Sequence, residues 1–270
     1  MAIRRALLLC LFILLSFPAL ADEVTISERK ASGYITLTAN NRTPSPITLR
    51  LQLNLDNVTT KVRNPGVFVL PPGSEQKLLD LVPGSKGRWN YRYNFQWIRG
   101  SYKANHTANQ TYRLPYADNK RVRIVQGYNG DVSHHGRLRY CTDFNLAEGT
   151  PVYCAREGLV VETISHFTVG RPDKRLMRKA NLVAVLHSDG TLGEYVHLKP
   201  GGVAVRIGQK VKSGALLGYS GNTGYSSGPH LHFGVYKARS DGQYYDTLPV
   251  RFQTDRGLVT LEQGKIYGHP

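Results

Sequence analysis

Two histidines in the run His230-Leu231-His232 are separated by a single residue and precede a strand-like segment, Phe233 to Tyr236. Side chains two positions apart on a β-strand share one face, so both imidazoles would point the same way while Leu231 enters the opposite layer. Such a pair suits a metal ligand with an acid–base group beside it, although two histidines on a solvated face would give the same pattern. A metal site therefore requires a carboxylate and a further imidazole.

Both groups occur upstream, where Asp143 follows His134 by nine residues. Two histidines, one carboxylate and water are the usual donors of a catalytic zinc site, whose open position polarises a carbonyl and activates water. Structural zinc sites are instead closed by four protein ligands. His197, in the strand-like run Tyr195-Val196-His197-Leu198, is a further candidate for the same groove, and the adjacent His135 is the alternative to His134.

The segments that must position these residues are Gly-rich and strand-like from about Ala117 onward. No long amphipathic helix is indicated, and the charged stretch from Arg171 to Lys179 predicts a loop or one helical turn. The turn signals between the strands are Asn129-Gly130, Ser188-Asp189-Gly190, Pro200-Gly201-Gly202 and the run Ser220-Gly221-Asn222-Thr223-Gly224. We therefore expect a second domain, residues 116–270, built mainly of antiparallel strands.

Apolar residues recur with period two between Val24 and Pro115, as in half-buried strands. Turn residues such as Pro71-Pro72-Gly73 and Pro83-Gly84 separate these strands at short intervals. The pattern predicts an antiparallel β-sandwich over residues 22–115 and an all-β protein as a whole.

One of these strands alternates aromatic with polar residues from Trp89 to Trp97. Exposed rings on one face could stack on sugars, but five rings on one face of a strand are more simply explained as sandwich core. We expect the core arrangement.

The first 21 residues have the pattern of a secretory signal peptide. Arg4 and Arg5 precede the apolar run from Ala6 to Leu15, and Pro18 and a small-residue triplet follow. The run is too short to span a bilayer, so no stable membrane insertion is expected after cleavage. Cys10 is a less favoured candidate for lipid attachment, because apolar residues continue well past it. We expect an exported protein, periplasmic, extracellular or cell-wall associated.

The chain is strongly basic, with 35 Lys and Arg residues against 19 Asp and Glu, a formal charge of +16. Such a charge favours an anionic environment or polymer. Export argues against nucleic acid as the partner, and there is no arginine-rich tract with interleaved aromatic residues. Nothing in the sequence indicates the oligomeric state.

Several ordered motifs together resemble the lysostaphin-type (LytM-type) peptidoglycan metalloendopeptidases over roughly residues 117 to 267. The motifs are Ser133-His134 through Asp143-Phe144, Glu148-Gly149-Thr150-Pro151-Val152-Tyr153, Ala155-Arg156-Glu157-Gly158, Tyr195-Val196-His197-Leu198, and Ser220-Gly221-Asn222-Thr223-Gly224 leading to Gly228-Pro229-His230-Leu231-His232-Phe233. The departure is in the first motif, where eight residues separate the histidine from the aspartate and many relatives have three.

The resemblance implies that His134, Asp143 and His232 bind Zn²⁺, while His197 and His230 assist the attacking water and the tetrahedral intermediate. It implies amide hydrolysis in the cross-linking peptides of peptidoglycan, by a mainly antiparallel catalytic domain. The alternative is a catalytically silent wall-binding regulator of cell-wall hydrolases that retains the fold.

Cys141 and Cys154 remain in the chain after signal cleavage. They lie on either side of the turn Leu146-Ala147-Glu148-Gly149, and a hairpin about that turn would place them opposite each other. In relatives these positions are commonly alanine, so two cysteines fit a paired replacement. We predict a disulfide, with two buried thiols as the alternative.

Overall fold

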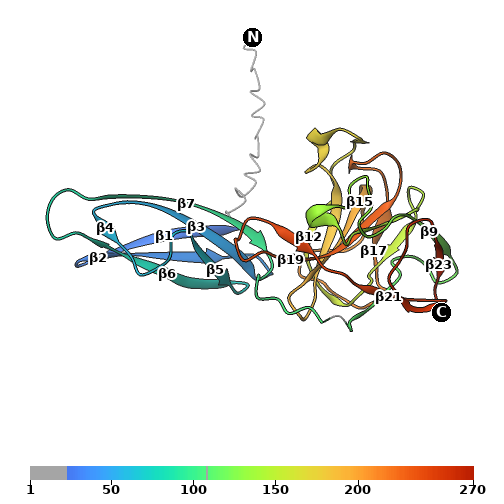
Figure 1. The fold of residues 1–270 in the computed structure, drawn as a ribbon, viewed down its shortest axis with the longest axis horizontal. Helices are drawn as coiled ribbons and strands as arrows, with labels where there is room; N and C mark the ends of the chain where they lie inside the picture. The colour runs from blue at the N-terminus through green and yellow to red at the C-terminus, as the bar shows by residue number, and fades with distance from the viewer. Residues whose placement is uncertain (1–22, 108) are drawn as a thin grey trace, which may run out of the picture.

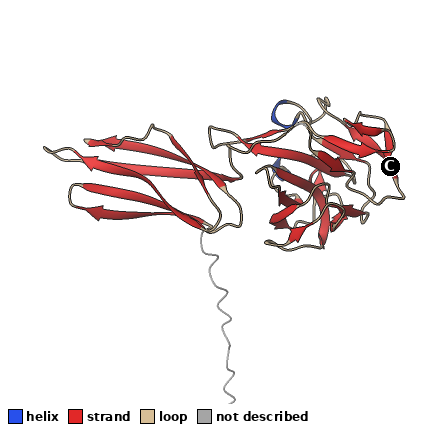
Figure 2. Ribbon diagram, turned by 90° about the horizontal axis from the view of Figure 1, so that it is seen from below, coloured by secondary structure: helices blue, strands red, loops and turns tan. Residues whose placement is uncertain are grey.

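The computed structural model describes residues 23–107 and 109–270, so the predicted signal peptide lies outside the described residues. Two bodies of strands follow one another along the long axis of the molecule (Figure 1). Strands and loops make up nearly all of both bodies (Figure 2). The all-β fold is thus as predicted, and the described helices are two 3-10 turns, η1 (Gly136–Leu138) and η2 (Lys174–Leu176).

The N-terminal body is a sandwich of two antiparallel sheets. One sheet has the order β1-β2-β6-β4, formed by Val24–Ala31, Tyr34–Asn41, Ser74–Pro83 and Val58–Thr59. The other has the order β5-β3-β7, formed by Gly66–Leu70, Ile47–Asp56 and Asn90–Arg99. The period-two pattern follows from this packing, since Leu49 and Leu51 are fully buried between the sheets while Gln52 and Asn54 face outward.

The aromatic strand β7 packs mostly as expected. Tyr91, Tyr93, Phe95 and Trp97 are partly buried against the sandwich core. Trp89 lies outside it, with 43% of its surface exposed, and stacks on Tyr91 at a ring-centroid distance of 6.3 Å. The rings therefore stabilise the sandwich, and a sugar-stacking face is not formed by the strand as a whole.

The C-terminal body is built on a large antiparallel sheet. Its main strand order is β16-β12-β14-β15-β19-β10-β9-β23. In that order the strands are Lys210–Val211, Gly158–Ile164, Asn181–Leu186, Leu192–Val203, Leu231–Ala238, Thr142–Phe144, Arg121–Gln126 and Ile266–Gly268. Outside this order, β17 (Leu216–Ser220) pairs with β15 and with β11 (Pro151–Tyr153), and β20 (Tyr245–Thr247) pairs with β19.

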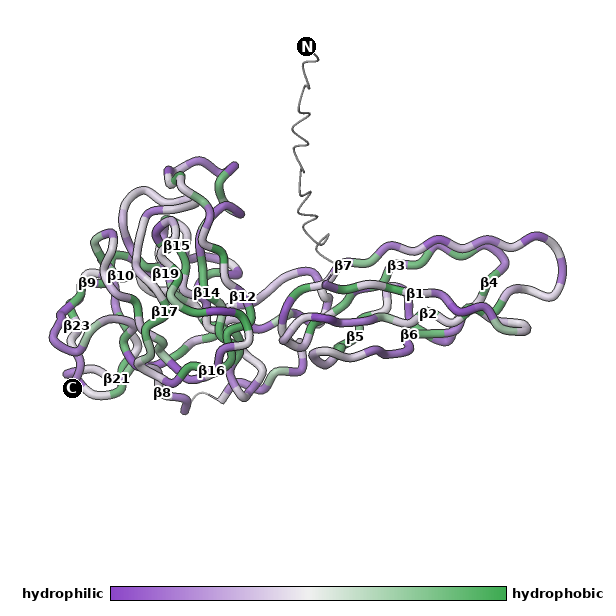
Figure 3. The backbone as a smooth tube through the Cα atoms, turned by 180° about the vertical axis from the view of Figure 1, so that it is seen from behind, coloured by the Kyte–Doolittle hydropathy of each residue, from purple (hydrophilic) through white to green (hydrophobic). Residues whose placement is uncertain are grey.

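The two faces of this sheet have different roles. Tyr195, Phe233 and Val183 point from neighbouring strands into the hydrophobic core. The alternate residues of the same strands point to the opposite face, where they line a groove. Figure 3 shows hydrophobic and hydrophilic residues interleaved along the strands of both bodies, as two-faced sheets require.

The segment just before residue 116 packs with the C-terminal body. Strand β8 (Thr111–Arg113) pairs in parallel with β21 (Arg251–Thr254), which pairs with β22 (Gly257–Val259). Tyr112 and Leu114 are fully buried in the C-terminal core. The alternation of residues in this segment is compatible with a strand of either domain. Its partner strand lies about 140 residues away, so the local pattern could not assign the segment to one domain.

Three short elements lie close to the groove, whose wall includes Tyr225 and Met177. Strand β13 (Gly170–Arg171) pairs in parallel with β18 (Gly224–Tyr225), and η2 follows within the charged stretch predicted as a loop or helical turn. Among the described residues, no helix is long and apolar enough to cross a membrane.

Candidate metal centre

Three of the predicted site residues converge at one point. Asp143 on β10 lies directly opposite His232 on β19, because the two strands pair in that register. His134 comes from the loop between β9 and β10. Its Nε2 lies 3.2 Å from Asp143 Oδ1 and 3.3 Å from His232 Nδ1, while His232 Nδ1 lies 2.8 Å from Asp143 Oδ1. One donor atom from each residue lies within 4.8 Å of the others, which fits a single metal ion.

A backbone carbonyl orients the ring of His134. Its Nδ1 lies 3.0 Å from Gly127 O, so Nδ1 carries the proton and Nε2 presents its lone pair to the donor set. On His232 the assignment is reversed, since Nδ1 faces the site and Nε2 lies 3.2 Å from the hydroxyl of Tyr236. The chemistry of this donor set, two imidazoles and a carboxylate, fits zinc.

Asp143 is held ionised by its neighbours. Burial opposes its ionisation, but the imidazoles of His134 and His232 beside it keep the pKa of this carboxyl well below its ordinary value. Gln126 Nε2 also donates to Asp143 Oδ2, at 3.0 Å. The Gln126 carbonyl oxygen accepts from the backbone N–H of Val132 and Ser133, so one side chain fixes both the carboxylate and the loop carrying His134. Nothing in the sequence singled out Gln126.

The two remaining histidines of the prediction face the same site. His230 Nδ1 lies 2.8 Å from Gly228 O, and His197 Nδ1 lies 2.6 Å from Thr223 O. In the neutral form of each ring the proton therefore lies on Nδ1, and Nε2 is the free nitrogen directed away from the carbonyl partner. The ring centroids of His197 and His230 are 4.6 Å apart, and His230 Nε2 lies 3.9 Å from Asp143 Oδ1.

His197 is constrained by both backbone and environment. Its φ of 66° lies in the left-handed region, which non-glycine residues rarely adopt. Burial, reinforced by the nearby His230 and His232, lowers the pKa of His197 to about 3, so the ring is neutral at ordinary pH. A neutral imidazole with a free Nε2 is a proton acceptor.

The structure distinguishes the candidate ligand His134 from its alternative, His135. His135 is exposed, whereas the adjacent His134 is fully buried within the donor set. His187 lies elsewhere, buried against Tyr112 with its Nδ1 3.0 Å from Thr191 Oγ1. Its pKa falls to about 3 through burial.

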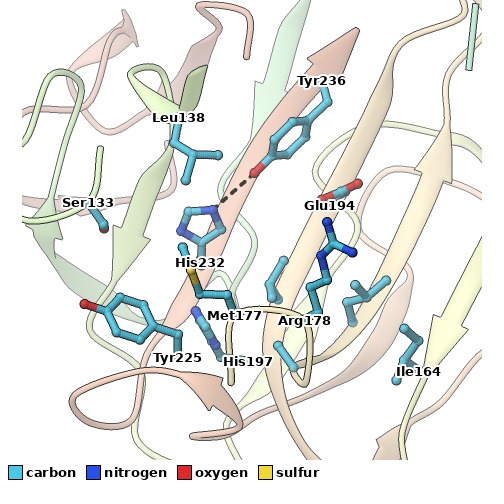
Figure 4. Close-up of a pocket in the computed structure, with 13 residues that line it drawn as sticks. Ser133, Leu138, Ile164, Met177, Arg178, Glu194, His197, Tyr225, His232 and Tyr236 are labelled. Atoms are coloured by element: carbon cyan, nitrogen blue, oxygen red, sulfur yellow. Dashed lines mark hydrogen bonds between the residues drawn. The ribbon is translucent and has the colours of Figure 1, made fainter. Parts of the chain in front are cut away.

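A groove on the sheet opens beside the donor set. One cavity of about 260 Å³ and another of about 140 Å³ share Ser133, His197, Tyr225 and His232 in their walls. His230 lines the smaller one, so both histidines of the run His230-Leu231-His232 reach the groove while Leu231 is buried in the core. Figure 4 shows His232 and His197 at one end of the larger cavity and Ile164 at the other. An extended chain laid in the groove would pass the histidines.

The predicted disulfide is wrong, because Cys141 and Cys154 are both free and buried. They do not face each other across a hairpin. Cys141 precedes β10, which pairs with β9 and β19, whereas Cys154 follows β11, which pairs with β17. Cys141 Sγ contacts the hydroxyl of Tyr236 at 3.3 Å, and Cys154 Sγ lies 2.9 Å from Arg156 O. The arrangement is the alternative of two buried thiols.

The fold and the site together define an all-β protein with a compact His/Asp/His metal centre in an open groove. Residues 137–247 match Peptidase family M23, and an N-terminal region precedes the matched range. The matched range contains Asp143, His197, His230 and His232, while His134 lies three residues before it.

Known proteins similar to this chain include a peptidoglycan DD-endopeptidase and lysostaphin. Peptidoglycan DD-endopeptidase ShyA of Vibrio cholerae is 40% identical over 92 residues, which are 34% of this chain and 19% of that protein. Lysostaphin of Staphylococcus simulans is 36% identical over 101 residues, 37% of this chain and 18% of that protein. The chain thus spans about a fifth of the length of these relatives.

A solved structure of the lysostaphin catalytic domain from the same Staphylococcus species is 32% identical. It covers 43% of this chain and 78% of its own, with a TM-score of 0.32.

Proposed function

We propose that this protein is an exported zinc metalloendopeptidase that hydrolyses amide bonds in the cross-linking peptides of bacterial peptidoglycan. The observation that carries the proposal is the convergence of His134, Asp143 and His232 in a groove that His197 and His230 also line. The M23 domain and the similarity to enzymes named as peptidoglycan endopeptidase and lysostaphin support the substrate class. The signal-peptide pattern and the basic charge support export to an anionic wall.

The residues of the groove divide the chemistry between them. Zinc held by His134 Nε2, the Asp143 carboxylate and His232 Nδ1 would supply Lewis acidity toward water and the scissile carbonyl. His230 or His197 would accept the proton of the attacking water at Nε2 and later return a proton to the leaving amine. The carbonyls of Gly228 and Thr223 keep both rings in the tautomer that this transfer needs.

Digestion of purified wall tests the function. We expect the mature protein to release soluble peptides from peptidoglycan, a chelator to stop the release, and added zinc to restore it. Mass spectrometry of fragments with a known cross-link would identify the cleaved bond. If zinc-loaded protein binds wall without cleaving any bond, the regulator described above is the correct function.

A further inference from the structure

The side chains on the floor of the groove form rows, in which each residue is paired with the next across four neighbouring strands. Strand pairing places His232, Val196, Leu182 and Ile164 side by side, on β19, β15, β14 and β12 in turn. All four line the larger cavity. The row beginning at the metal centre is therefore apolar beyond His232.

The next row, two residues along each strand, carries charge. Its members are Gly234, Glu194, Ala184 and Glu162, again on β19, β15, β14 and β12. Glu162 is neutralised by Arg99 of the N-terminal sandwich, whose Nε lies 3.1 Å from Glu162 Oε2. Glu194 has no such partner among the described residues, since it forms no ion pair or side-chain hydrogen bond there, and Gly234 opposite it has no side chain to offer one.

Glu194 carries a carboxyl group that has no cationic partner in the described part of the chain and is partly shielded from water. It is partly buried, it lines the larger cavity, and its carboxylate lies on the same face as Tyr236 and His232 (Figure 4). Burial and the nearby Glu162 raise the pKa of Glu194 to about 8. A carboxylate so placed costs free energy unless a cation joins it, which is why such groups are rarely left without a role.

A second charged side chain without an ion-pair partner among the described residues lines the same cavity. Arg178, on the loop after η2, lines it together with Glu194 and is shown in Figure 4 extending toward that carboxylate. Among the described residues Arg178 forms no ion pair and no hydrogen bond. A ligand bearing only an ammonium would meet the repulsion of Arg178, and one bearing only a carboxylate would leave Glu194 without a cation. A group with both charges satisfies both side chains.

We infer that Glu194 and Arg178 form a specificity subsite for a zwitterionic amino-acid group, an ammonium and a carboxylate on one carbon, carried by the substrate peptide next to the scissile bond. The free end of a diamino dicarboxylic acid side chain has this chemistry. Glu194 accepts hydrogen bonds from the ammonium, and the guanidinium of Arg178 donates to the carboxylate. The apolar row between them and His232 accommodates the aliphatic chain that joins this end to the backbone. The inference rests on the proposed function, whose substrate it narrows.

Three forms of one cleavable cross-linked peptide test the subsite. The first has the free zwitterionic end, the second has its amine acetylated, and the third has its carboxylate amidated. We expect wild-type kcat/KM to favour the free form over each capped form by about 10- to 100-fold, the range of a hydrogen bond to a charged group. Equal cleavage of all three forms would overturn the inference.

Two variants test which charge of the ligand each side chain binds. Glu194→Gln should abolish the discrimination against the acetylated peptide, and Arg178→Gln the discrimination against the amidated one. Glu262→Gln removes an exposed carboxylate outside the groove and should leave both ratios as in the wild type. Since each protein is compared with itself across peptides, a general loss of stability cannot mimic the result. Unchanged kcat/KM ratios between the free and capped peptides in both groove variants would mean that the two side chains do not contribute to substrate specificity.

Binding separates this inference from the proposed function. If wild-type protein cleaves none of the peptides, the function fails and the subsite is judged by calorimetry with the same free and capped forms. Tighter binding of the free form by about 10-fold or more, lost in both groove variants, supports the subsite without catalysis. Equal affinities for all three forms contradict it.

Discussion

At the scale of single residues, the centre depends on which ring nitrogen each histidine presents. Carbonyls of Gly127, Gly228 and Thr223 hold the Nδ1 of His134, His230 and His197, and so free three Nε2 atoms for the groove. Fixing the orientation of a ligand in this way typically raises metal affinity 10- to 100-fold over an unsupported ring. The backbone carbonyls thus preorganise the histidine rings for metal binding.

The donor set predicts the outcome of removing single ligands. His134→Ala, Asp143→Ala and His232→Ala should each lose bound zinc and hydrolysis together, since two remaining donors hold a metal poorly. Metal content per chain by elemental analysis and peptide release from wall are the two measurements. His135→Ala is the matched control, because that ring is exposed beside His134 and should be dispensable. Fully active protein devoid of divalent metal would refute the assignment.

His230 predicts a separation of metal binding from turnover. It lines the cavity but lies outside the compact donor set, with Nε2 3.9 Å from the Asp143 carboxylate. His230→Ala should keep zinc near one ion per chain and lose kcat by about 100-fold or more, the size of a lost acid–base group. Wild-type turnover in this variant would remove His230 from proton transfer.

At the scale of elements, strand pairing decides the state of the cysteines. The short turn between Cys141 and Cys154 suggested a hairpin, but β10 and β11 take different partners and carry the two thiols into different hydrophobic clusters. Burial raises the pKa of Cys141 to about 12 and that of Cys154 to about 11. Because the thiolate is the reactive form, both thiols are inert in the folded protein.

This arrangement predicts a thiol count that a disulfide would not give. Unreduced mature protein should show two free thiols per chain after denaturation and should react far more slowly with a thiol reagent while folded. Reductant should leave the thermal midpoint unchanged. A count of zero without intermolecular dimers would restore the disulfide.

At the scale of the whole molecule, the two bodies are joined through shared contacts. Arg99 at the end of β7 pairs with Glu162 in the large sheet of the C-terminal body and with Glu23 of its own body. Arg50 Nη1 donates to Asp241 O at 3.2 Å, across the same junction. The N-terminal sandwich therefore neutralises one of the two carboxylates beside the groove, and we propose that it also positions wall polymer there.

The position of β8 predicts where the chain can be cut. A fragment beginning at Ala117 loses β8 and the buried rings of Tyr112 and Tyr116, each worth about 3–5 kcal/mol by comparison with other aromatic core deletions. It should unfold at a much lower temperature than the full chain, or fail to fold. A fragment beginning at residue 107 keeps both rings and should retain zinc. Thermal melts followed by circular dichroism compare the two, and equal stability would contradict this account of the core.

Local pattern alone determined much of this protein. Period-two alternation in Leu49 to Leu55 and in Trp89 to Trp97 reports a strand with one buried face, because neighbouring side chains on a strand point to opposite sides. The same rule placed His230 and His232 on one face with Leu231 in the core. The motif set then indicated His134, Asp143 and His197 as members of one site.

Tertiary pairing decided the rest, because the partner of a strand is chosen by residues distant in sequence. Register brought Asp143 opposite His232, sent Cys141 and Cys154 apart, and drew Tyr112 into the C-terminal core. It also placed Glu194 in the row beside the metal centre, although no spacing in the sequence links them. A strand carries its own alternation but not the identity of its neighbours, so the charges of the groove emerge only when the sheet is assembled.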